Sequence, residues 1–349
     1  MDKNRNEIID IVKGIAILLV VYGHIIQILY IGAGKSFFED NIEKVICSFH
    51  MPLFALVSGY LFYISYKRRT IKEILCKRIV GLLQPLLIWG SLYYISYQIL
   101  LKILEGNMTL SIKEWWITIS GPFFWFLWSM MVSSICVLVS EYVKKYSIVC
   151  MIIMFALVSI FPNGEYTMFV YPFFVCGVVG QKYKEKISKY INSYIEWGII
   201  AVFIILLFFY EEKHYIYTTG ISLFTLERSW LEQLGIDCFR YMIGLLGSLS
   251  VIILTKKGIH RFPKNIKKVL ALCGKKSLEI YILQCIIVSW IFSMFYSNIS
   301  LRVGVALRNI MIIDLFVAPL TTIAFVMLII LLIKILGKSR KLNQILFCR

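Results

Sequence analysis

The feature that most constrains this chain is a series of apolar segments that recurs along its whole length. A helix needs about 20 consecutive apolar residues to cross the hydrocarbon core of a bilayer. Backbone N–H and C=O groups find no water there, so such segments are expected to be α-helical. Hydropathy identifies ten of them, at residues 8–30, 45–65, 79–101, 120–140, 147–162, 166–181, 192–210, 238–255, 276–297 and 309–334. We therefore predict an all-α polytopic membrane protein with about ten transmembrane helices.

The composition agrees with this class. Of the 349 residues, 59% are hydrophobic and only 16% are charged, which leaves more apolar surface than a soluble fold can bury. The first segment contains Asp10 and Lys13 and has no small-residue cleavage site, so we expect it to be retained as a helix. The nine cysteines lie mostly in apolar runs without paired spacing, which indicates buried thiols and no metal site. Residues 1–349 are predicted to form a single transmembrane domain.

The basic residues predict the orientation in the membrane, because Lys and Arg are retained on the cytoplasmic side. With the N-terminus inside, alternate loops and their membrane ends collect 28 of the 37 Lys and Arg residues. Both termini are therefore predicted to be cytoplasmic. The net charge of +17 then reflects topology and attraction to anionic lipids, and we expect no nucleic-acid partner.

Lys13 and His24 lie eleven positions apart in the first segment. On an α-helix this step is almost three whole turns, so both side chains point the same way, about 16 Å apart along the axis. Ionisable groups within a membrane usually face a protein interior or a wet cavity, which predicts a site here. The alternative is that Lys13 extends to the interface and His24 forms an interhelical hydrogen bond.

The second segment adds another histidine. His50 stands at its predicted outer end, with Pro52 suited to the first helical turn. Two of the four histidines in the chain therefore fall on the same side of adjacent segments.

Several motifs in these and later segments resemble a known family. The first two segments carry Asp10, Lys13, Gly14 and His24, and then Phe49, His50, Met51, Pro52, Ser58 and Gly59. Later segments carry WFLWSMM from Trp125, PFFVCGVVG from Pro172 and GKKSLEIYIL from Gly274. In this order the motifs resemble the membrane-bound acyltransferase-3 family over most of the chain. The resemblance implies a membrane enzyme that transfers acyl groups from coenzyme A to sugars.

The sequence departs from the family pattern at two positions. The family often has His after the motif SLEIYIL, where this chain has Gln284. Of two basic positions upstream of Pro85, Arg78 fills the first, but the second is Gly81. The resemblance assigns donor binding to Lys13 and Arg78, and we expect neighbouring basic residues to supply the rest of the charge. These neighbours are Arg68, Arg69, Lys72 and Lys77.

The implied chemistry assigns roles to the polar residues. Acyl transfer to a sugar hydroxyl needs a base, and an imidazole with a reference pKa of about 6.5 is suitable. We predict that His24 is this base and that His50 is its partner or an acceptor ligand. Asp10 is expected to pair with Lys13 on the same helix face. Asp314 either orients a histidine or caps its helix end.

The outer segment 211–237 holds aromatic residues and carboxylates, which either bind sugars or form an interfacial belt. Arg240, just beyond it, suits either an acidic sugar or lipid headgroups.

The leading hypothesis is a transmembrane O-acyltransferase that takes an acyl group from cytosolic acyl-CoA, with acetyl-CoA as the expected donor. Its acceptor would be a hydroxyl of a cell-surface glycan or of the lipid-linked precursor. The expected partners are acyl-CoA, a saccharide and membrane lipids, in the plasma membrane of a bacterium. The alternative is a polytopic glycan transporter or flippase whose charged residues line a path without chemistry. The sequence does not indicate an oligomeric state.

Overall fold

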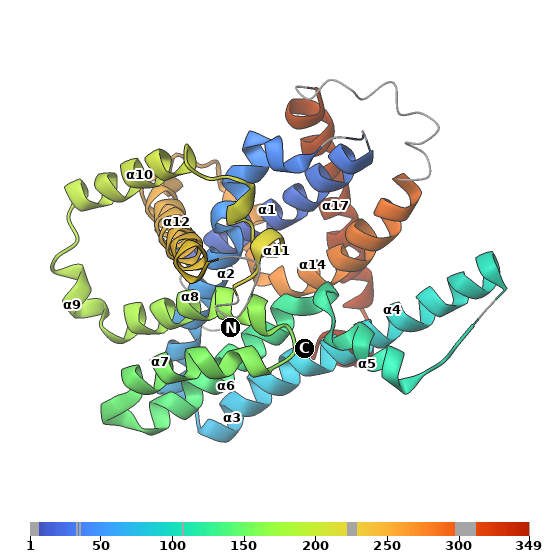
Figure 1. The fold of residues 1–349 in the computed structure, drawn as a ribbon, viewed down its shortest axis with the longest axis horizontal. Coiled ribbons are helices and arrows are strands. Elements are labelled where there is room, and N and C mark those ends of the chain that lie inside the picture. The colour runs from blue at the N-terminus through green and yellow to red at the C-terminus, as the bar shows by residue number, and fades with distance from the viewer. Residues whose placement is uncertain are drawn as a thin grey trace. The chain divides into compact units, whose positions relative to one another are not determined.

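A computed structural model describes residues 7–32, 34, 36–106, 108–221, 229–296 and 312–348 (Figure 1). Within these ranges the regular structure consists of helices, and no strand occurs. The chain forms two compact units. Unit 1 comprises residues 1–57 and 183–333, and unit 2 comprises residues 58–182 and 334–349. The all-α fold predicted from the sequence is confirmed.

Unit 1 is built around the first helix. Its elements are α1 (Glu7–Gly32), η1 (Phe37–Glu39), the first half of α2 (Asn41–Arg68), α9 (Lys184–Ser188), α10 (Ser193–Leu207), η6 (Glu212–His214), α11 (Ile216–Thr219), α12 (Trp230–Gly258), η7 (Ile259–Arg261), α13 (Lys264–Lys275), α14 (Ser277–Gln284), the π-helical η8 (Cys285–Phe292) and η9 (Ile313–Val317), and most of α17 (Ala318–Leu336). α1 packs along α13. α10 lies beside α12 (Figure 1).

Unit 2 begins within α2. Its further elements are α3 (Ile71–Leu75), the π-helical η2 (Cys76–Val80), α4 (Gly81–Glu105), α5 (Ile112–Ser120), η3 (Pro122–Phe124), α6 (Trp125–Tyr142), η4 (Lys144–Tyr146), α7 (Ser147–Leu157), η5 (Val158–Ile160), α8 (Gly164–Lys182) and α18 (Arg340–Phe347). α6 packs against α8, and α18 lies along α4. The side chain of Trp89 on α4 donates to the carbonyl of Leu346 at 3.0 Å, which fixes the end of α18.

Seven helical stretches of the described chain are long and apolar enough to cross a bilayer. They are Glu7–Gly32, Asn41–Arg68, Ile71–Glu105, Ile112–Tyr142, Trp230–Arg261, Ser277–Tyr296 and Ile313–Leu336. The other three predicted segments lie on α7, α8 and α10. α7 has 11 residues and α10 has 15, fewer than the ~20 that a bilayer requires. The polytopic membrane fold is thus confirmed, whereas spans at these three helices stay a prediction.

Glycines set the closest helix contacts of each unit. In unit 1, a Cβ on Gly14 of α1 would lie 2.0 Å from the carbonyl oxygen of Leu270 on α13. A Cβ on Gly274 would lie 1.8 Å from the carbonyl oxygen of Asp10. In unit 2, a Cβ on Gly59 would lie 1.9 Å from the carbonyl oxygen of Phe174 on α8. These glycines of the family-like motifs therefore let helix backbones touch, as small residues do in membrane bundles.

Candidate functional site

The first helix is continuous through the predicted site. α1 runs unbroken from Glu7 to Gly32, so Lys13 and His24 share a face as their spacing predicts. Both side chains are half-buried. An eleven-residue step on this helix places the two residues about 16 Å apart along the axis.

The start of α2 brings a carboxylate inward. Asp40 caps this helix with two hydrogen bonds. Its Oδ1 accepts from the backbone N–H of Glu43 at 2.5 Å, and its carbonyl oxygen accepts from the backbone N–H of Lys44 at 3.0 Å. The cap lets the helix begin at Asn41, ahead of the apolar run. Glu43 consequently lies on the first turn and is 0% exposed.

Glu43 connects α1 and α2 through polar side chains. Its Oε1 accepts from the amide nitrogen of Gln27 on α1 at 2.6 Å and from the thiol of Cys47 at 3.0 Å. The side chain of Gln27 also lies beside the imidazole of His24, close enough to interact with it. The other carboxylate oxygen of Glu43 has no hydrogen-bond partner among the described residues. It faces Gly23, where a Cβ would lie 3.1 Å from it.

His50 completes this group. Its Nδ1 lies 2.7 Å from the carbonyl oxygen of Ile46, and because a carbonyl only accepts, Nδ1 carries the proton. Nε2 of a neutral His50 therefore presents a lone pair. The imidazoles of His24 and His50 are near enough for their charges to interact. We call His24, Gln27, Glu43, Cys47 and His50 the histidine cluster.

The predicted supporting residue Asp314 lies in a second polar group of unit 1. The hydroxyl of Tyr30 on α1 is 2.9 Å from a carboxylate oxygen of Asp40 and 2.9 Å from one of Asp314. The hydroxyl of Tyr22 donates to the backbone carbonyl of Asp314 at 2.9 Å. Asp314 thus ties η9 to the first helix and to the cap of α2, and its predicted orienting of a histidine stays a prediction.

The predicted donor-binding residues divide between the two units. Arg68, Arg69, Lys77 and Arg78 belong to unit 2, whereas Lys13 belongs to unit 1. The guanidinium of Arg78 packs over the ring of Phe62 at 5.5 Å, and the charges of Arg78 and Arg69 interact. Arg68, Arg69 and Lys77 are exposed. Unit 2 therefore gathers an exposed basic group where α2 meets α3 and η2.

The two positions that depart from the family pattern differ in their surroundings: Gln284 is buried, whereas Gly81 has open space beside it. Gln284 is 0% exposed, its amide nitrogen contacts the sulfur of Cys285 at 3.1 Å, and its oxygen has no partner among the described residues. A Cβ on Gly81 would meet no atom within 4 Å, so a longer side chain has room there. Asp10 is buried beside the α1–α13 contact, and its pairing with Lys13 stays a prediction.

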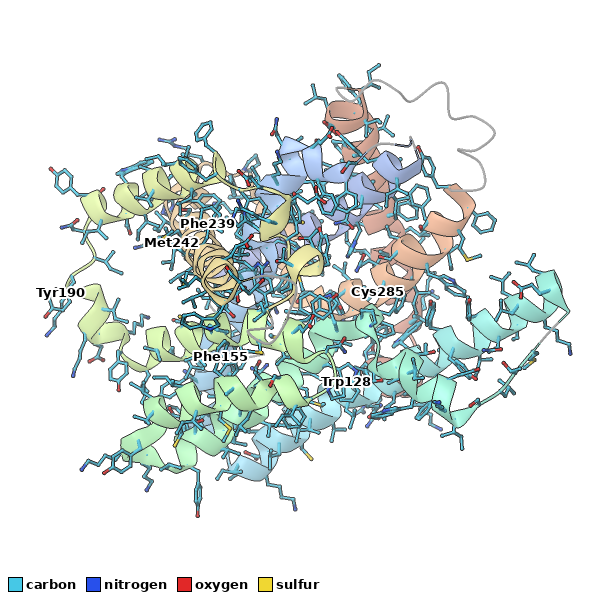
Figure 2. The ribbon with its side chains drawn as sticks, in the orientation of Figure 1. Trp128, Phe155, Tyr190, Phe239, Met242 and Cys285 are labelled. Carbon is cyan, nitrogen blue, oxygen red and sulfur yellow. The ribbon has the colours of Figure 1, made fainter. Side chains whose placement is uncertain are left out.

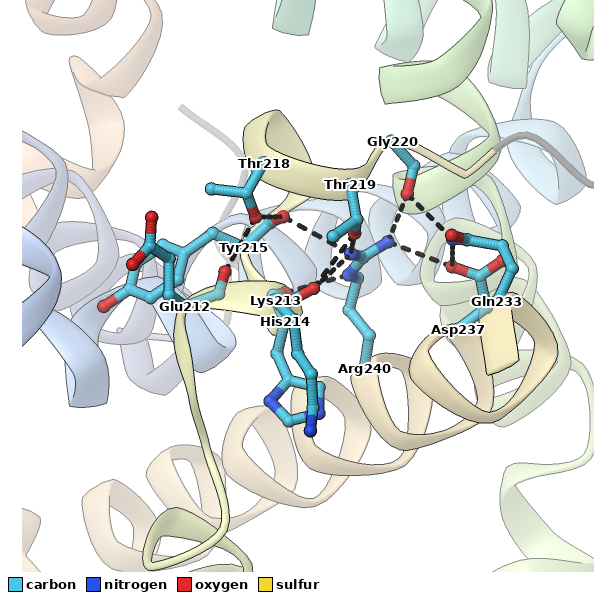
Figure 3. Close-up of polar contacts among 10 residues, drawn as sticks. All are labelled: Glu212, Lys213, His214, Tyr215, Thr218, Thr219, Gly220, Gln233, Asp237 and Arg240. Atoms are coloured by element: carbon cyan, nitrogen blue, oxygen red, sulfur yellow. Dashed lines mark hydrogen bonds and ion pairs between the residues drawn. The ribbon is translucent and has the colours of Figure 1, made fainter. Parts of the chain in front are cut away.

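Arg240 organises the segment between α10 and α12. Its guanidinium donates to the carbonyl oxygens of His214 at 2.9 Å and Gly220 at 2.8 Å, to Oγ1 of Thr219 at 2.6 Å and to Asp237 at 3.0 Å (Figure 3). All three nitrogens thus donate to the protein itself. Neither sequence interpretation of Arg240 is correct: the guanidinium holds a turn instead of receiving an anion.

This turn reaches the histidine cluster through tyrosines. The hydroxyl of Tyr217 lies 3.8 Å from the sulfur of Cys47, and the ring of Tyr215 packs edge-on against Phe38 at 5.0 Å. Burial raises the pKa of both tyrosine hydroxyls, so they remain protonated and can serve as hydrogen-bond donors.

Sequence reasoning missed Gln27 and Glu43. Gln27 stands three residues after His24, so helical spacing places the two side chains on one face. Glu43 stands three residues after Asp40, a spacing typical of a helix N-terminus. Both signals were present, but hydropathy placed the second segment at 45–65 and left Glu43 outside it.

Comparisons with known proteins agree with this structure. A family model described as an acyltransferase domain, that of the acyltransferase-3 family, matches residues 6–337. Nodulation protein NolL of Sinorhizobium fredii (strain NBRC 101917 / NGR234) is 30% identical over 207 residues, which cover 57% of this chain and 54% of that protein. Nodulation protein NolL of Mesorhizobium japonicum (strain LMG 29417 / CECT 9101 / MAFF 303099) is 30% identical over 181 residues, covering 50% and 47%.

The chain thus spans about half the length of the curated relatives it matches. No solved structure gives a significant match. The family model, by contrast, covers nearly the whole chain. The protein is therefore a member of the acyltransferase-3 family.

Proposed function

We propose that the protein transfers an acyl group, acetyl in the first instance, from a coenzyme A thioester to a hydroxyl of a cell-surface glycan or its lipid-linked precursor. Membership of the acyltransferase-3 family supports the reaction class. The observation that carries the proposal is the histidine cluster, in which two imidazoles from different helices lie near enough for their charges to interact, beside a buried carboxylate.

The cluster suits base-catalysed acyl transfer. In the proposed step, the acceptor oxygen attacks the thioester carbonyl carbon while a nitrogen of His24 takes the hydroxyl proton. A C–O bond forms and the C–S bond breaks. The imidazolium returns the proton to the departing thiolate, so the histidine is regenerated. His50 presents its Nε2 lone pair toward the acceptor, where it can accept a hydrogen bond from a sugar hydroxyl.

Gln27 and Glu43 act in this scheme by positioning His24. With its nitrogen donating to Glu43, Gln27 offers its oxygen to an N–H of His24 and fixes the imidazole. A buried carboxylate at the end of this chain favours the imidazolium that forms as the proton is taken. The arrangement resembles the role of a carboxylate that orients a catalytic histidine, here with an amide between the two.

The donor is proposed to enter from the cytoplasmic side. Its phosphates fit the basic residues Arg68, Arg69, Lys77 and Arg78, since guanidinium groups bind phosphate in a bidentate manner. Lys13 would contact the donor about 16 Å along α1 from His24, roughly the reach of the thin pantetheine arm. The setting we propose is a bacterial plasma membrane, which the rhizobial origin of the relatives supports.

Direct detection of the product tests this function. Cells with and without the protein are supplied with isotope-labelled acetate, and their surface glycans are analysed by mass spectrometry. We expect a protein-dependent mass increase of one labelled acetyl group per modified sugar. If the glycans carry no protein-dependent acyl group and glycan export fails without the protein, the transporter alternative is correct.

A further inference from the structure

A cavity lies in unit 1, beside the turn that Arg240 holds. It has a volume of about 380 Å³, within the range typical of small-molecule pockets. It is lined by Phe209, Glu211, Lys213, His214, Glu232, Gly235, Ile236 and Phe239. We call this the 209–239 pocket. None of its residues belongs to the histidine cluster.

The pocket is built by a rigid support. Arg240 is only 2% exposed and binds the backbone carbonyls of Lys213, His214 and Gly220, so it fixes the turn that presents two lining side chains. Figure 3 shows its guanidinium inside the turn, while the imidazole of His214 extends away from it. The opposite wall is α12, from which Phe239 projects (Figure 2). Such a wall does not need to reorganise to receive a ligand.

His214 is set up as a hydrogen-bond donor to the pocket. Its Nδ1 accepts from the backbone N–H of Glu211 at 2.9 Å, so the proton of the neutral ring sits on Nε2. Burial, followed by the charge of Lys213, lowers the pKa of His214 to about 4, and the ring is neutral at physiological pH. Nε2 has no hydrogen-bond partner within the described ranges. The ring is held against Phe239 with 4.3 Å between centroids.

The lining combines aromatic faces with carboxylates. Phe209 is exposed and Phe239 half-buried, and both supply apolar rings to the cavity. Glu211 and Glu232 supply acceptors, and the Lys213 ammonium lies 2.8 Å from the Glu211 carboxylate. The hydrogen bond from Lys213, followed by its charge, lowers the pKa of Glu211, so this carboxylate is ionised at neutral pH. With two carboxylates against one paired ammonium, the lining disfavours anions such as lipid phosphates.

We propose that the 209–239 pocket is a binding site for a neutral sugar ring. Phenyl rings pack on the C–H face of a pyranose, carboxylates accept from its hydroxyls, and Nε2–H of His214 donates to them. An acidic sugar would meet uncompensated carboxylate charge and bind less tightly. The inference rests on the proposed function in identifying this sugar as a unit of the acceptor glycan, but sugar binding itself needs no donor.

The experiment measures binding of methyl β-glucoside and methyl β-glucuronide to the full-length protein in nanodiscs, by saturation-transfer NMR and without acyl-CoA. Gly235→Leu fills the pocket, because a Cβ there meets no atom within 4 Å. The matched control is Gly198→Leu, on α10 and equally open but outside the pocket. We expect saturable glucoside binding that weakens at least tenfold in Gly235→Leu and stays unchanged in Gly198→Leu.

A second variant probes charge without changing volume. Glu232→Gln should weaken glucoside binding severalfold and lower the ratio of glucoside affinity to glucuronide affinity. Glu185→Gln, at an exposed carboxylate on α9, should change neither the glucoside affinity nor this ratio. Three results would each overturn the proposal. The first is the absence of saturable glucoside binding, and the second is glucoside binding by Gly235→Leu that equals that of the unmodified protein. The third is preferential binding of glycerophosphoglycerol, used as a lipid-headgroup probe. Sugar binding without any acyl transfer would instead refute the proposed function and leave the pocket assignment standing.

Discussion

The amide nitrogen of Gln27 on α1 lies 2.6 Å from a carboxylate oxygen of Glu43 on α2. Glu43 is fully buried, and Gln27 also lies beside the imidazole of His24, so one amide stands between a carboxylate on α2 and a histidine on α1. A buried charge is costly unless it is paired or useful. This relationship therefore marks Glu43 as a positioning residue for the proposed base.

Glu43→Gln tests that role. Removing the charge while keeping the size should lower kcat for acyl transfer by roughly 10- to 100-fold, because less charge stabilises the imidazolium. The donor KM should stay within about twofold, since Glu43 is not proposed to touch the donor. Cys47→Ala is the control, because Cys47 binds the same oxygen without linking it to His24. Equal effects of both variants would argue for a purely structural carboxylate.

The contact between α1 and α13 predicts a strong effect of small substitutions. Gly14→Ala and Gly274→Ala each place a methyl group about 2 Å from a backbone carbonyl oxygen of the other helix, so one helix must move away. Overpacking of this kind typically costs about 1–3 kcal/mol. We expect both variants to lower the thermal unfolding midpoint in detergent. Gly198→Ala, which meets no atom within 4 Å, should not. Stability unchanged by Gly14→Ala would contradict the contact.

Gly81 offers a gain-of-function test of donor binding. A side chain at this position has open space, and a basic residue there would restore the charge expected in the family pattern. Gly81→Arg should lower the acyl-CoA KM by about 3- to 10-fold, the effect of one added charge-assisted contact. Gly180→Arg on α8 is the control, because it adds the same charge at an equally open glycine. A rise in KM in Gly81→Arg would remove this region from the donor site.

His214 predicts a pH-dependent loosening of the turn at 211–221. Above pH 6.5 the ring is neutral in the folded and the unfolded segment, so its stabilising effect is fully present. As the pH falls toward 4, only the unfolded segment gains the proton, and stability falls by up to about 1.4 kcal/mol per pH unit. Hydrogen exchange of amides 211–221, corrected for intrinsic rates, should rise from pH 6.5 to 4.5. His214→Asn keeps an acceptor but cannot titrate, so its corrected exchange should be flat.

Local spacing predicted the part of the site that lies on one helix. Lys13 and His24 share a face because α1 is continuous, and helical periodicity requires nothing else. The approach of His50 to His24 depends on how α2 packs against α1, so the sequence predicted only that both lie at the same membrane side. Glu43 was missed because a charged residue ends a hydropathy window. In the structure the helix begins directly after its cap, Asp40, and therefore includes Glu43.

Other features lay beyond side-chain patterns. The partners of Arg240 are mostly backbone carbonyls of a turn, and no sequence pattern reveals which carbonyls a folded turn presents. Within the described residues, each of the ten predicted segments overlaps a helix, but two helices end while hydropathy continues: α7 passes into the 3-10 turn η5 after Leu157, and α10 ends at Leu207. The glycines at 14 and 274 are recognisable as motif residues, yet their mutual role appears only when α1 and α13 are packed together.

The most direct test of the central claim is acyl transfer by His24→Ala, with purified protein in liposomes, labelled acetyl-CoA and a glycan acceptor. A general base contributes about 10² to 10⁴-fold, so the variant should work near background while its folding, membrane insertion and acetyl-CoA binding stay intact. His50→Ala should also be severe, with a larger effect on the acceptor KM. A folded His24→Ala protein that acylates at close to the wild-type rate would contradict the account.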